Sequence, residues 1–281
     1  MSTKQQTKNT PSHNPENQNE PPFLDEFQEE GDLGVYCDLF SAKSQIMGQD
    51  GGIVTALLLK GLKEGLFDAA IVVQRKNGYS AEVISAETPE QILASKGSIY
   101  HRVGTTKKLL ELVAQNKKRL AVVCTPCEGA TIRKIQQTLC KDVELTIIGL
   151  FCFGAFNPQR LKEAIKTQLG VDIDRATKTQ VKQGKFIVSV EEKEYSCKIE
   201  DLIKASDRVC GGCGEFVSML ADVSVGSAGS KDGYSTVIVR SKKGAKLAAN
   251  LVDVQKDIVD KPIIVKLVKL KKEQAKKNYT Q

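Results

Sequence analysis

The sequence predicts a mixed α/β and α+β fold, in which a partly parallel sheet flanked by helices is followed by a β-hairpin region and a helical C-terminus. Two observations support this prediction. Apolar, β-branched runs alternate with helical segments over residues 35–169, which is typical of parallel strands joined by helices. After Gly170 the alternation stops. The 281 residues are enough for one large or two modest domains with a substantial core.

The first half supplies the predicted parallel strands and their helices. The run AAIVVQ, at residues 69–74, is typical of a buried strand because of its β-branched residues. Thr88 caps a helix in which Pro89 fits the first turn and Gln91 completes a capping box. The other strands are expected at residues 35–40, 120–124 and 145–151, and helices at residues 53–66, 105–116, 129–139 and 158–169.

The second half has a different pattern. Residues 186–190 and 193–197 predict a hairpin that turns at Glu191 and Glu192. A short helix is expected at residues 199–205, strands at 222–226 and 235–240 around a glycine-rich loop, and mostly helix from residue 243 onward.

The N-terminus differs in composition from the rest of the chain. Residues 1–33 are rich in Asn, Gln, Pro, Thr and Glu and offer little apolar surface to bury, so we expect a disordered polar tail. Residues 34–281 are expected to form the functional domain, with a sub-boundary near residue 170.

Composition and charge exclude several classes of protein. The net charge is +7, part of it from a lysine-rich C-terminus that is typical of a solvated helix face. That segment has almost no interleaved aromatic residues, so nucleic acid is not an expected partner. No apolar run reaches the roughly 20 residues of a membrane span, and the N-terminus has no apolar segment typical of a secretory signal. We therefore expect a cytoplasmic chain without a membrane span.

The eight cysteines are the strongest chemical signal. In a reducing compartment, clustered cysteines are more often metal ligands, cluster ligands or catalytic groups than disulfides. Cys210 and Cys213 form a C-x-x-C pair on a glycine-rich turn, while Cys127 and Cys152 each follow an apolar strand. Loops at the carboxyl ends of parallel strands gather at one edge of a sheet, so these four cysteines can meet at one point.

The spacing of the cysteines leaves three alternatives open. An iron–sulfur cluster would have a scattered ligand set, because the ferredoxin run of four close cysteines is absent. Structural zinc could use Cys124 with Cys127 and the C-x-x-C pair, although Cys124 ends a buried strand and is expected in the core. The third alternative is a pair of free or redox-active thiols. Cys37, Cys140 and Cys197 have no partner at metal-ligand spacing and are interpreted as ordinary thiols.

Three polar, glycine-rich loops are candidates for ligand binding. Residues 48–52 (GQDGG) open a helix, where free backbone amides bind anions, although an empty tight loop has the same pattern. Residues 226–235 offer hydroxyls and amides but match neither a P-loop nor a dinucleotide fingerprint. Residues 96–101 include His101, which we interpret as a surface or hydrogen-bonding residue.

Taken together and in order, these motifs resemble a known family. The segments QDGGIVTALL, ASKGSIY, TPCEGA, GLFCFGAF, CGGC, ADVSVGSAGS and GYSTVIVR look like those of the beta subunit of coenzyme F420 hydrogenases and dehydrogenases. The resemblance covers roughly residues 34–280. Two departures are a longer polar N-terminal tail and the lack of the ferredoxin module that longer relatives carry.

The resemblance implies two cofactors and their ligands. It implies a [4Fe-4S] cluster held by Cys127, Cys152, Cys210 and Cys213, which favours this set over the zinc alternative with Cys124. It also implies FAD in contact with the three loops. The implied flavin contacts are Gln49, Asp50, Gly51, Gly52, Gly97, Ser98, Tyr100, Gly226, Ser227, Gly229, Ser230, Tyr234 and Ser235.

The resemblance also implies a function. An electron-transfer flavoprotein subunit would exchange single electrons through the cluster and hydride with coenzyme F420, in complex with hydrogenase, dehydrogenase or electron-carrier subunits. Lys185 or Arg133 are candidates to hold the acidic tail of F420, although Arg133 also fits a solvated helix surface. The alternatives are a formate dehydrogenase subunit, another donor or acceptor, or a zinc-stabilised binding subunit without redox function.

Overall fold

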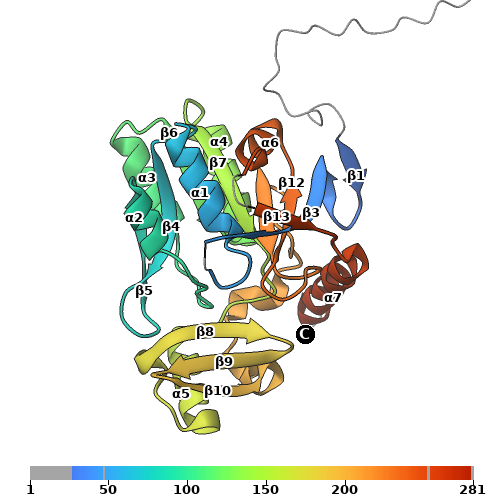
Figure 1. Cartoon of the computed structure of the whole chain (residues 1–281). Helices are drawn as coiled ribbons and strands as arrows, with labels where there is room; N and C mark the ends of the chain where they lie inside the picture. The colour runs from blue at the N-terminus through green and yellow to red at the C-terminus, as the bar shows by residue number, and fades with distance from the viewer. Residues whose placement is uncertain (1–26, 47, 252–253, 280–281) are drawn as a thin grey trace, which may run out of the picture.

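An eight-stranded mixed sheet forms the centre of the computed structural model, which describes residues 27–46, 48–251 and 254–279 (Figure 1). Its strand order is β13-β3-β12-β11-β7-β6-β4-β5. The four parallel strands are β4 (Ala69–Arg75), β6 (Arg119–Cys124), β7 (Glu144–Leu150) and β11 (Val223–Gly226). The antiparallel strands are β5 (Ala81–Ala86), β12 (Ser235–Val239), β3 (Asp38–Ser44) and β13 (Val254–Asp257).

Helices cover both faces of this sheet because its strands are apolar on both sides. In β4, Ala70 and Val72 pack in one cluster, whereas Ala69 and Ile71 pack in another, as the two-residue period of a strand requires. The first face is covered by α1 (Ile53–Lys63), α2 (Pro89–Ala94) and α6 (Lys242–Ala248), and the second by α3 (Thr106–Ala114) and α4 (Pro126–Thr138).

A second, smaller body interrupts the connection between β7 and β11. It contains α5 (Pro158–Leu169), the short 3₁₀ helix η1 (Ile173–Arg175) and an antiparallel sheet of β8 (Ala176–Lys182), β9 (Lys185–Val190) and β10 (Lys193–Lys198). Phe186 and Val188 pack on Leu161 and Ile165 in its own core. Two further 3₁₀ helices, η2 (Ile199–Ala205) and η3 (Arg208–Gly212), lead the chain back to β11. Figure 1 shows this sheet below the large one.

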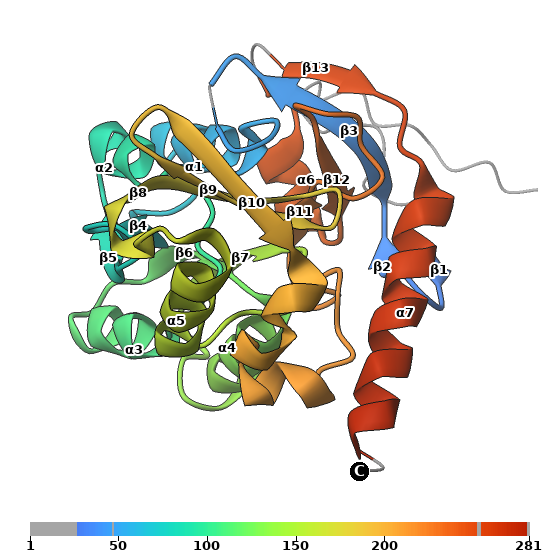
Figure 2. The ribbon, with the colours of Figure 1, turned by 90° about the horizontal axis from the view of Figure 1, so that it is seen from below.

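The C-terminal helix α7 (Lys261–Tyr279) lies along one side of the molecule beside the N-terminal strands, as Figure 2 shows. These strands are β1 (Gln28–Glu30) and β2 (Gly34–Tyr36), which pair with each other. Leu33 is fully buried and packs with Ile264 and Val268 of the helix. Ion pairs from Lys261 to Glu30 and from Lys272 to Asp32 join the two ends of the chain.

The predicted mixture of α/β and α+β structure is confirmed, including the hairpin and the capping box of α2. Some details differ. The predicted strand at residues 35–40 is two strands broken at Cys37, whose N–H donates to Val239 of β12. Helix α4 begins at Pro126, three residues before the predicted start, and residues 199–205 form a 3₁₀ helix. Strands β1, β5, β8 and β13 were not predicted.

The predicted polar tail falls mostly outside the described residues, since residues 1–26 are not described. Within the described part, residues 28–30 form β1 and Leu33 is buried, so ordered structure begins before the expected boundary at residue 34. Among the described helices, none combines the length and the apolar character that crossing a membrane requires.

Candidate functional site

Three parallel strands deliver cysteine-bearing or glycine-rich loops to the same edge of the large sheet. Strand β6 ends at Cys124 and leads to Cys127, β7 ends at Leu150 and leads to Cys152, and β11 ends at Gly226. Because these strands are parallel, their carboxyl ends lie side by side, which is where α/β sheets commonly bind ligands.

We call Cys127, Cys152, Cys210 and Cys213 the cysteine centre. Cys127 lies in the first turn of α4, with its sulfur 3.4 Å from Thr125 Oγ1. The N–H of Cys152 donates to the carbonyl of Phe216 at 2.9 Å. Cys210 lies in η3 and Cys213 follows it, with the N–H of Cys213 donating to the Cys210 carbonyl at 3.3 Å.

The thiols of the cysteine centre act on one another electrostatically. The pKa of Cys152 is raised to about 12, first by burial and then by the neighbouring Cys210 and Cys127. The pKa of Cys210 is also raised, mainly by burial, and Cys127 adds to the effect. The structure therefore brings Cys127, Cys152 and Cys210 near one another, and Cys213 belongs to the same turn as Cys210.

The described residues show no preformed site for a single metal ion, and they place Cys124 in the core. Within the part of the chain that the structure describes, no three His, Cys, Asp or Glu side chains are placed to hold one ion. Cys124, the fourth ligand of the zinc alternative, is only 3% exposed and packs in the core of the second face, as predicted. Cys140 is also buried in that core.

The chemistry of the cysteine centre fits an iron–sulfur cluster. Buried thiolates need a positively charged partner, since burial and mutual repulsion otherwise keep them protonated. The cluster irons would supply that charge, and backbone N–H groups would bond the sulfurs. Such a donor is present, because the N–H of Ala155 donates to Cys210 Sγ at 3.4 Å.

We call the three glycine-rich loops, together with β8, the loop site. The N–H of Gly51 donates to Ser235 Oγ at 3.1 Å, which joins the first and third loops. The side-chain amide of Gln49 donates to the Thr179 carbonyl of β8 at 3.1 Å. Asp232 in the third loop pairs with Lys182 of β8 at 2.9 Å. The predicted loops therefore converge on one strand of the small sheet.

The second loop joins this assembly through Tyr100. The Val181 N–H of β8 donates to Tyr100 Oη at 3.0 Å, and burial raises the pKa of this phenol. Ser98 and Gln49 also contact the Tyr100 hydroxyl, since both lower its pKa. Asp50 lies nearby, with its pKa raised mainly by burial.

Several predicted flavin contacts have a structural role inside the protein. A Cβ on Gly51 would lie 2.4 Å from the Ala42 carbonyl oxygen, and one on Gly226 would lie 2.2 Å from the Phe151 ring. Gly52 and Gly229 have positive φ angles of 70° and 83°, and a Cβ at either position would lie too close to neighbouring backbone atoms. Both features favour glycine.

The hydroxyls of the third loop are also bonded within the protein. Ser230 lies within hydrogen-bond distance of the Ser41 and Thr236 hydroxyls, and Tyr234 donates to the Gln255 side chain. Ser227 is exposed. Gly97 differs from these glycines, because it combines a φ of 114° with open space where a Cβ would lie.

Sequence reasoning missed the basic strand that faces these loops. Lys178 and Lys182 of β8 both act on Asp50 and lower its pKa, which opposes the effect of burial. Arg75 at the end of β4 donates to the Thr179 hydroxyl at 3.1 Å. The β-branched residues Thr177, Thr179 and Val181 stand at alternate positions of the run ATKTQVK, and this was the signal available in the sequence.

The segment 151–156 connects the two sites. Phe151 packs on Gly226 of the loop site, and Cys152 follows it directly. Farther along, the N–H of Ala155 donates to Cys210 Sγ and the N–H of Phe156 donates to the Tyr100 carbonyl at 2.7 Å. One short stretch of backbone thus contacts both the cysteine centre and the loop site.

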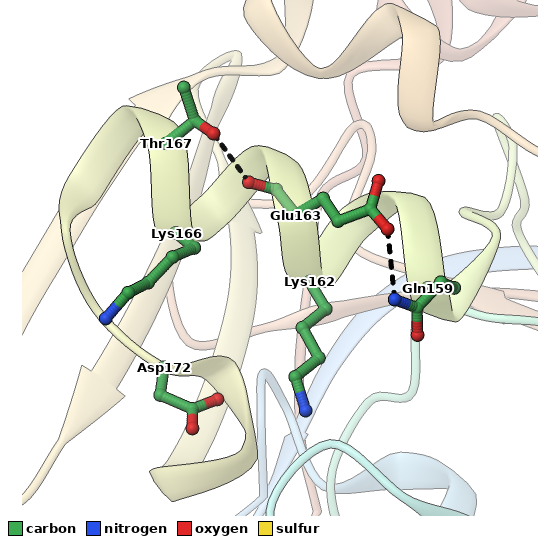
Figure 3. Close-up of a pocket in the computed structure, with 6 residues that line it drawn as sticks. All are labelled: Gln159, Lys162, Glu163, Lys166, Thr167 and Asp172. Atoms are coloured by element: carbon green, nitrogen blue, oxygen red, sulfur yellow. Dashed lines mark hydrogen bonds between the residues drawn. The ribbon is translucent and has the colours of Figure 1, made fainter.

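A pocket of about 400 Å³ lies elsewhere, on the outer side of α5 (Figure 3). It is lined by Gln159, Lys162, Glu163, Lys166, Thr167 and Asp172. Glu163 already bonds within the helix, to Gln159 and through its carbonyl to Thr167. None of the predicted site residues lines this pocket, so we do not assign the function to it.

Three other predicted residues can now be placed. Arg133 forms an ion pair with Asp222 at 2.8 Å and donates to the Leu220 carbonyl, so its guanidinium group is bonded within the protein and is not a purely solvated helix residue. Lys185 is exposed at the first position of β9. His101 lies 3.0 Å from the Tyr79 carbonyl oxygen, which confirms a hydrogen-bonding role.

Comparison with known proteins bears directly on this site. Two family models match the chain: the N-terminal part of the coenzyme F420 hydrogenase/dehydrogenase beta subunit over residues 39–111, and its C-terminal part over residues 117–262. The chain belongs to this family. Its relatives include subunits of oxidoreductases, and the matched range includes all four residues of the cysteine centre.

Members of the family differ in their reactions. The coenzyme F420 hydrogenase subunit beta of Methanothermobacter thermautotrophicus is 32% identical over 88% of this chain and 95% of its own length. The coenzyme F420-dependent sulfite reductase of Methanocaldococcus jannaschii is 35% identical over 85% of this chain, but only 41% of its own length is matched.

A solved structure shares the fold. A chain of the F420-reducing [NiFe] hydrogenase complex from Methanosarcina barkeri superposes with a TM-score of 0.82 and 29% identity, covering 90% of this chain and 93% of that chain. The mixed fold and the family are therefore established together.

Proposed function

We propose that the protein is the flavin and iron–sulfur subunit of an F420-dependent oxidoreductase complex. In this proposal the cysteine centre holds a [4Fe-4S] cluster, the loop site holds FAD, and coenzyme F420 is the substrate. The observation that carries the proposal is the segment 151–156, since Phe151 packs on Gly226 of the loop site and Ala155 bonds Cys210 of the cysteine centre.

The adjacency of the two sites suits the chemistry. When bound, a [4Fe-4S] cluster carries single electrons, F420 exchanges hydride, and FAD converts between the two, so FAD must lie between the other two groups. The protein's own contribution is to fix their positions. The N–H of Ala155 donates toward Cys210 Sγ, and the Cys152 N–H is bonded to Phe216, which holds the loop after β7 in place.

The loop site offers groups for both acidic ligands. Helix α1 begins at Ile53 after the N-cap residue Gly52, without a side-chain cap and without an acidic residue in its first turn, so its first N–H groups suit a phosphate. Lys178 and Lys182 add positive charge beside Asp50. The acidic tail of F420 and the pyrophosphate of FAD are the ligands that this charge would favour.

Composition and absorption spectrum of the purified protein test the proposal. We expect iron, sulfide and flavin in the ratio of one [4Fe-4S] cluster to one FAD, with broad visible absorption from the cluster beneath the flavin bands. A chain that contains zinc and neither flavin nor iron would contradict the proposal and favour the binding subunit without redox function.

The electron donor is a separate question, because the family includes both hydrogenase and sulfite reductase members. Purification of the native complex and assays of F420 reduction with hydrogen and then with formate would distinguish a hydrogenase from a formate dehydrogenase. We propose the hydrogenase function, because two coenzyme F420 hydrogenase beta subunits are matched over 95% and 91% of their own length.

A further inference from the structure

Helix α7 packs against the turn that carries Cys210 and Cys213. The side-chain amide of Asn278 donates to the Gly211 carbonyl at 2.9 Å. A Cβ placed on Gly214 would meet the Cα of Lys272 at 3.7 Å, so helix and turn are in close contact. The family match ends at residue 262, near the first residue of this helix, so the match assigns no role to α7.

Lys271 of α7 is unusual because its side chain is buried. Its exposed fraction is 4%, although lysine is almost never fully buried unless it is paired. Its Nζ donates to the Phe153 carbonyl at 2.6 Å and to the Cys210 carbonyl at 3.3 Å, and it lies 5.5 Å from the centre of the Phe153 ring. Lys271 therefore ties the loop after β7 to the turn of the cysteine centre.

The charged end of Lys271 lies between the two cysteine loops. Its Nζ bonds the carbonyl of Cys210 itself and the carbonyl of Phe153, the residue after Cys152. An ammonium group bonded only to neutral carbonyls is costly to bury, and a nearby negative charge offsets that cost. The thiolates of the cysteine centre, in their ligand form, supply such a charge.

We propose that Lys271 is a positioning residue that joins the two cysteine loops and stabilises the negative charge added when the cluster takes up an electron. The inference rests on the proposed function. In this step one electron enters from the redox partner, no bond to a cysteine breaks, and the cluster with its four thiolates becomes more negative by one charge. A fixed positive charge favours that reduced form.

The test is the midpoint potential of the cluster in the full chain, measured by redox titration monitored by electron paramagnetic resonance. Lys271→Met removes the charge and both hydrogen bonds, Lys271→Gln keeps an amide donor without charge, and Lys271→Arg keeps the charge. Lys269→Met is the matched control, because Lys269 is on the same helix, its side chain is 62% exposed, and its ion pair at 3.6 Å is with Asp32 and not with the cysteine centre.

We expect the equilibrium constant for reduction to fall about tenfold in both neutral variants, which is about 59 mV for one electron. Lys271→Arg and Lys269→Met should stay within about twofold of the wild type, since the first retains the charge and the second loses an exposed charge that pairs with Asp32. Thermal unfolding of each variant identifies loss of structure. If Lys271→Met fails to load a cluster, Lys271→Gln supplies the measurement.

Two results would overturn the inference alone: potentials of the neutral variants equal to that of the wild type, or a shift in Lys271→Arg as large as in Lys271→Met. The second result would mean that packing and not charge controls the cluster. A wild-type chain that binds flavin but no cluster would overturn both this inference and the iron–sulfur part of the proposed function.

Discussion

The cysteine centre and the loop site differ in how far contacts within the protein stabilise their polar groups. In the loop site, the polar groups bond to one another, as Gly51 does to Ser235 and Tyr100 to Val181. In the cysteine centre, burial raises the pKa of Cys152 and Cys210, and neighbouring thiols add to the effect. The difference suggests that the loop site is formed before a ligand arrives, whereas the cysteine centre would gain stability from the cluster that we propose.

The largest expected effect is on the cysteine centre. Cys152→Ala removes one of four proposed ligands, so the cluster should be lost and the rate of F420 reduction should fall by more than about 100-fold, since loss of an outer-shell partner alone costs about 10–100-fold in metal affinity or activity. Iron analysis and the F420 assay measure this change. Cys197→Ala is the control, because Cys197 lies on β10 in the small sheet. Retention of the full iron content in Cys152→Ala would show that Cys152 is not a ligand.

A substitution that overpacks the loop site should lower the free energy of unfolding. Gly51→Ala places a Cβ against the Ala42 carbonyl and the Ser235 N–H, two backbone groups that cannot give way easily. Overpacking of this kind costs about 1–3 kcal/mol in the free energy of unfolding. The expected result is a lower unfolding temperature with the flavin lost in parallel. Gly104→Ala is the control, since open space surrounds that position and its φ is not positive. Equal unfolding temperatures would contradict a tightly preformed loop.

Removal of positive charge from the loop site is expected to lower ligand affinity by a moderate amount. The double substitution of Lys178 and Lys182 by Gln removes the basic groups beside Asp50, and the affinity for FAD or F420 should fall up to about fivefold for each exposed charge. Flavin fluorescence and F420 fluorescence titrations measure the two dissociation constants. Lys193→Gln on β10 is the control. Unchanged affinity for both ligands would exclude β8 from the ligand site.

The smallest expected effect is the contribution of Asp50 to the pH dependence of stability. Burial raises the pKa of its carboxyl above the ordinary 3.8, so the folded state holds the proton more tightly than the unfolded chain. The stability from this group is present below 3.8 and is lost as pH rises through the raised pKa. Asp50→Asn should remove that decline, and urea unfolding across about pH 4 to 7 measures it. Parallel pH curves for the two proteins would contradict the prediction.

The sequence predicts the parts of the fold that depend on local pattern. The run AAIVVQ gives β4, and the Thr88 capping box gives the start of α2, because hydrophobic period and capping are local properties. Strand β13 was missed because its sequence, VQKD, is short and polar at a sheet edge. Its pairing with β3 depends on residues distant in sequence.

In the candidate site, too, local motifs could be predicted from the sequence and long-range contacts could not. The motifs identify the cysteines and the loops, since each is a short run with a chemical signature. The roles of Lys271 and β8 could not be predicted, because Lys271 meets Phe153 and Cys210 only through the packing of α7. Arg133 was misjudged for a related reason, as its partner Asp222 lies 89 residues away.

Reduction of the cluster by reduced F420 tests the central claim, that the segment 151–156 places a one-electron centre beside a flavin. Reduced F420 gives up hydride and the cluster accepts single electrons, so electrons can pass between them only through an adjacent flavin. We expect the paramagnetic signal of the reduced cluster when reduced F420 is added to the flavin-loaded protein, and no signal from the flavin-depleted protein. A flavin-loaded protein whose intact cluster stays oxidised in excess reduced F420, or equal signals with and without flavin, would contradict the account.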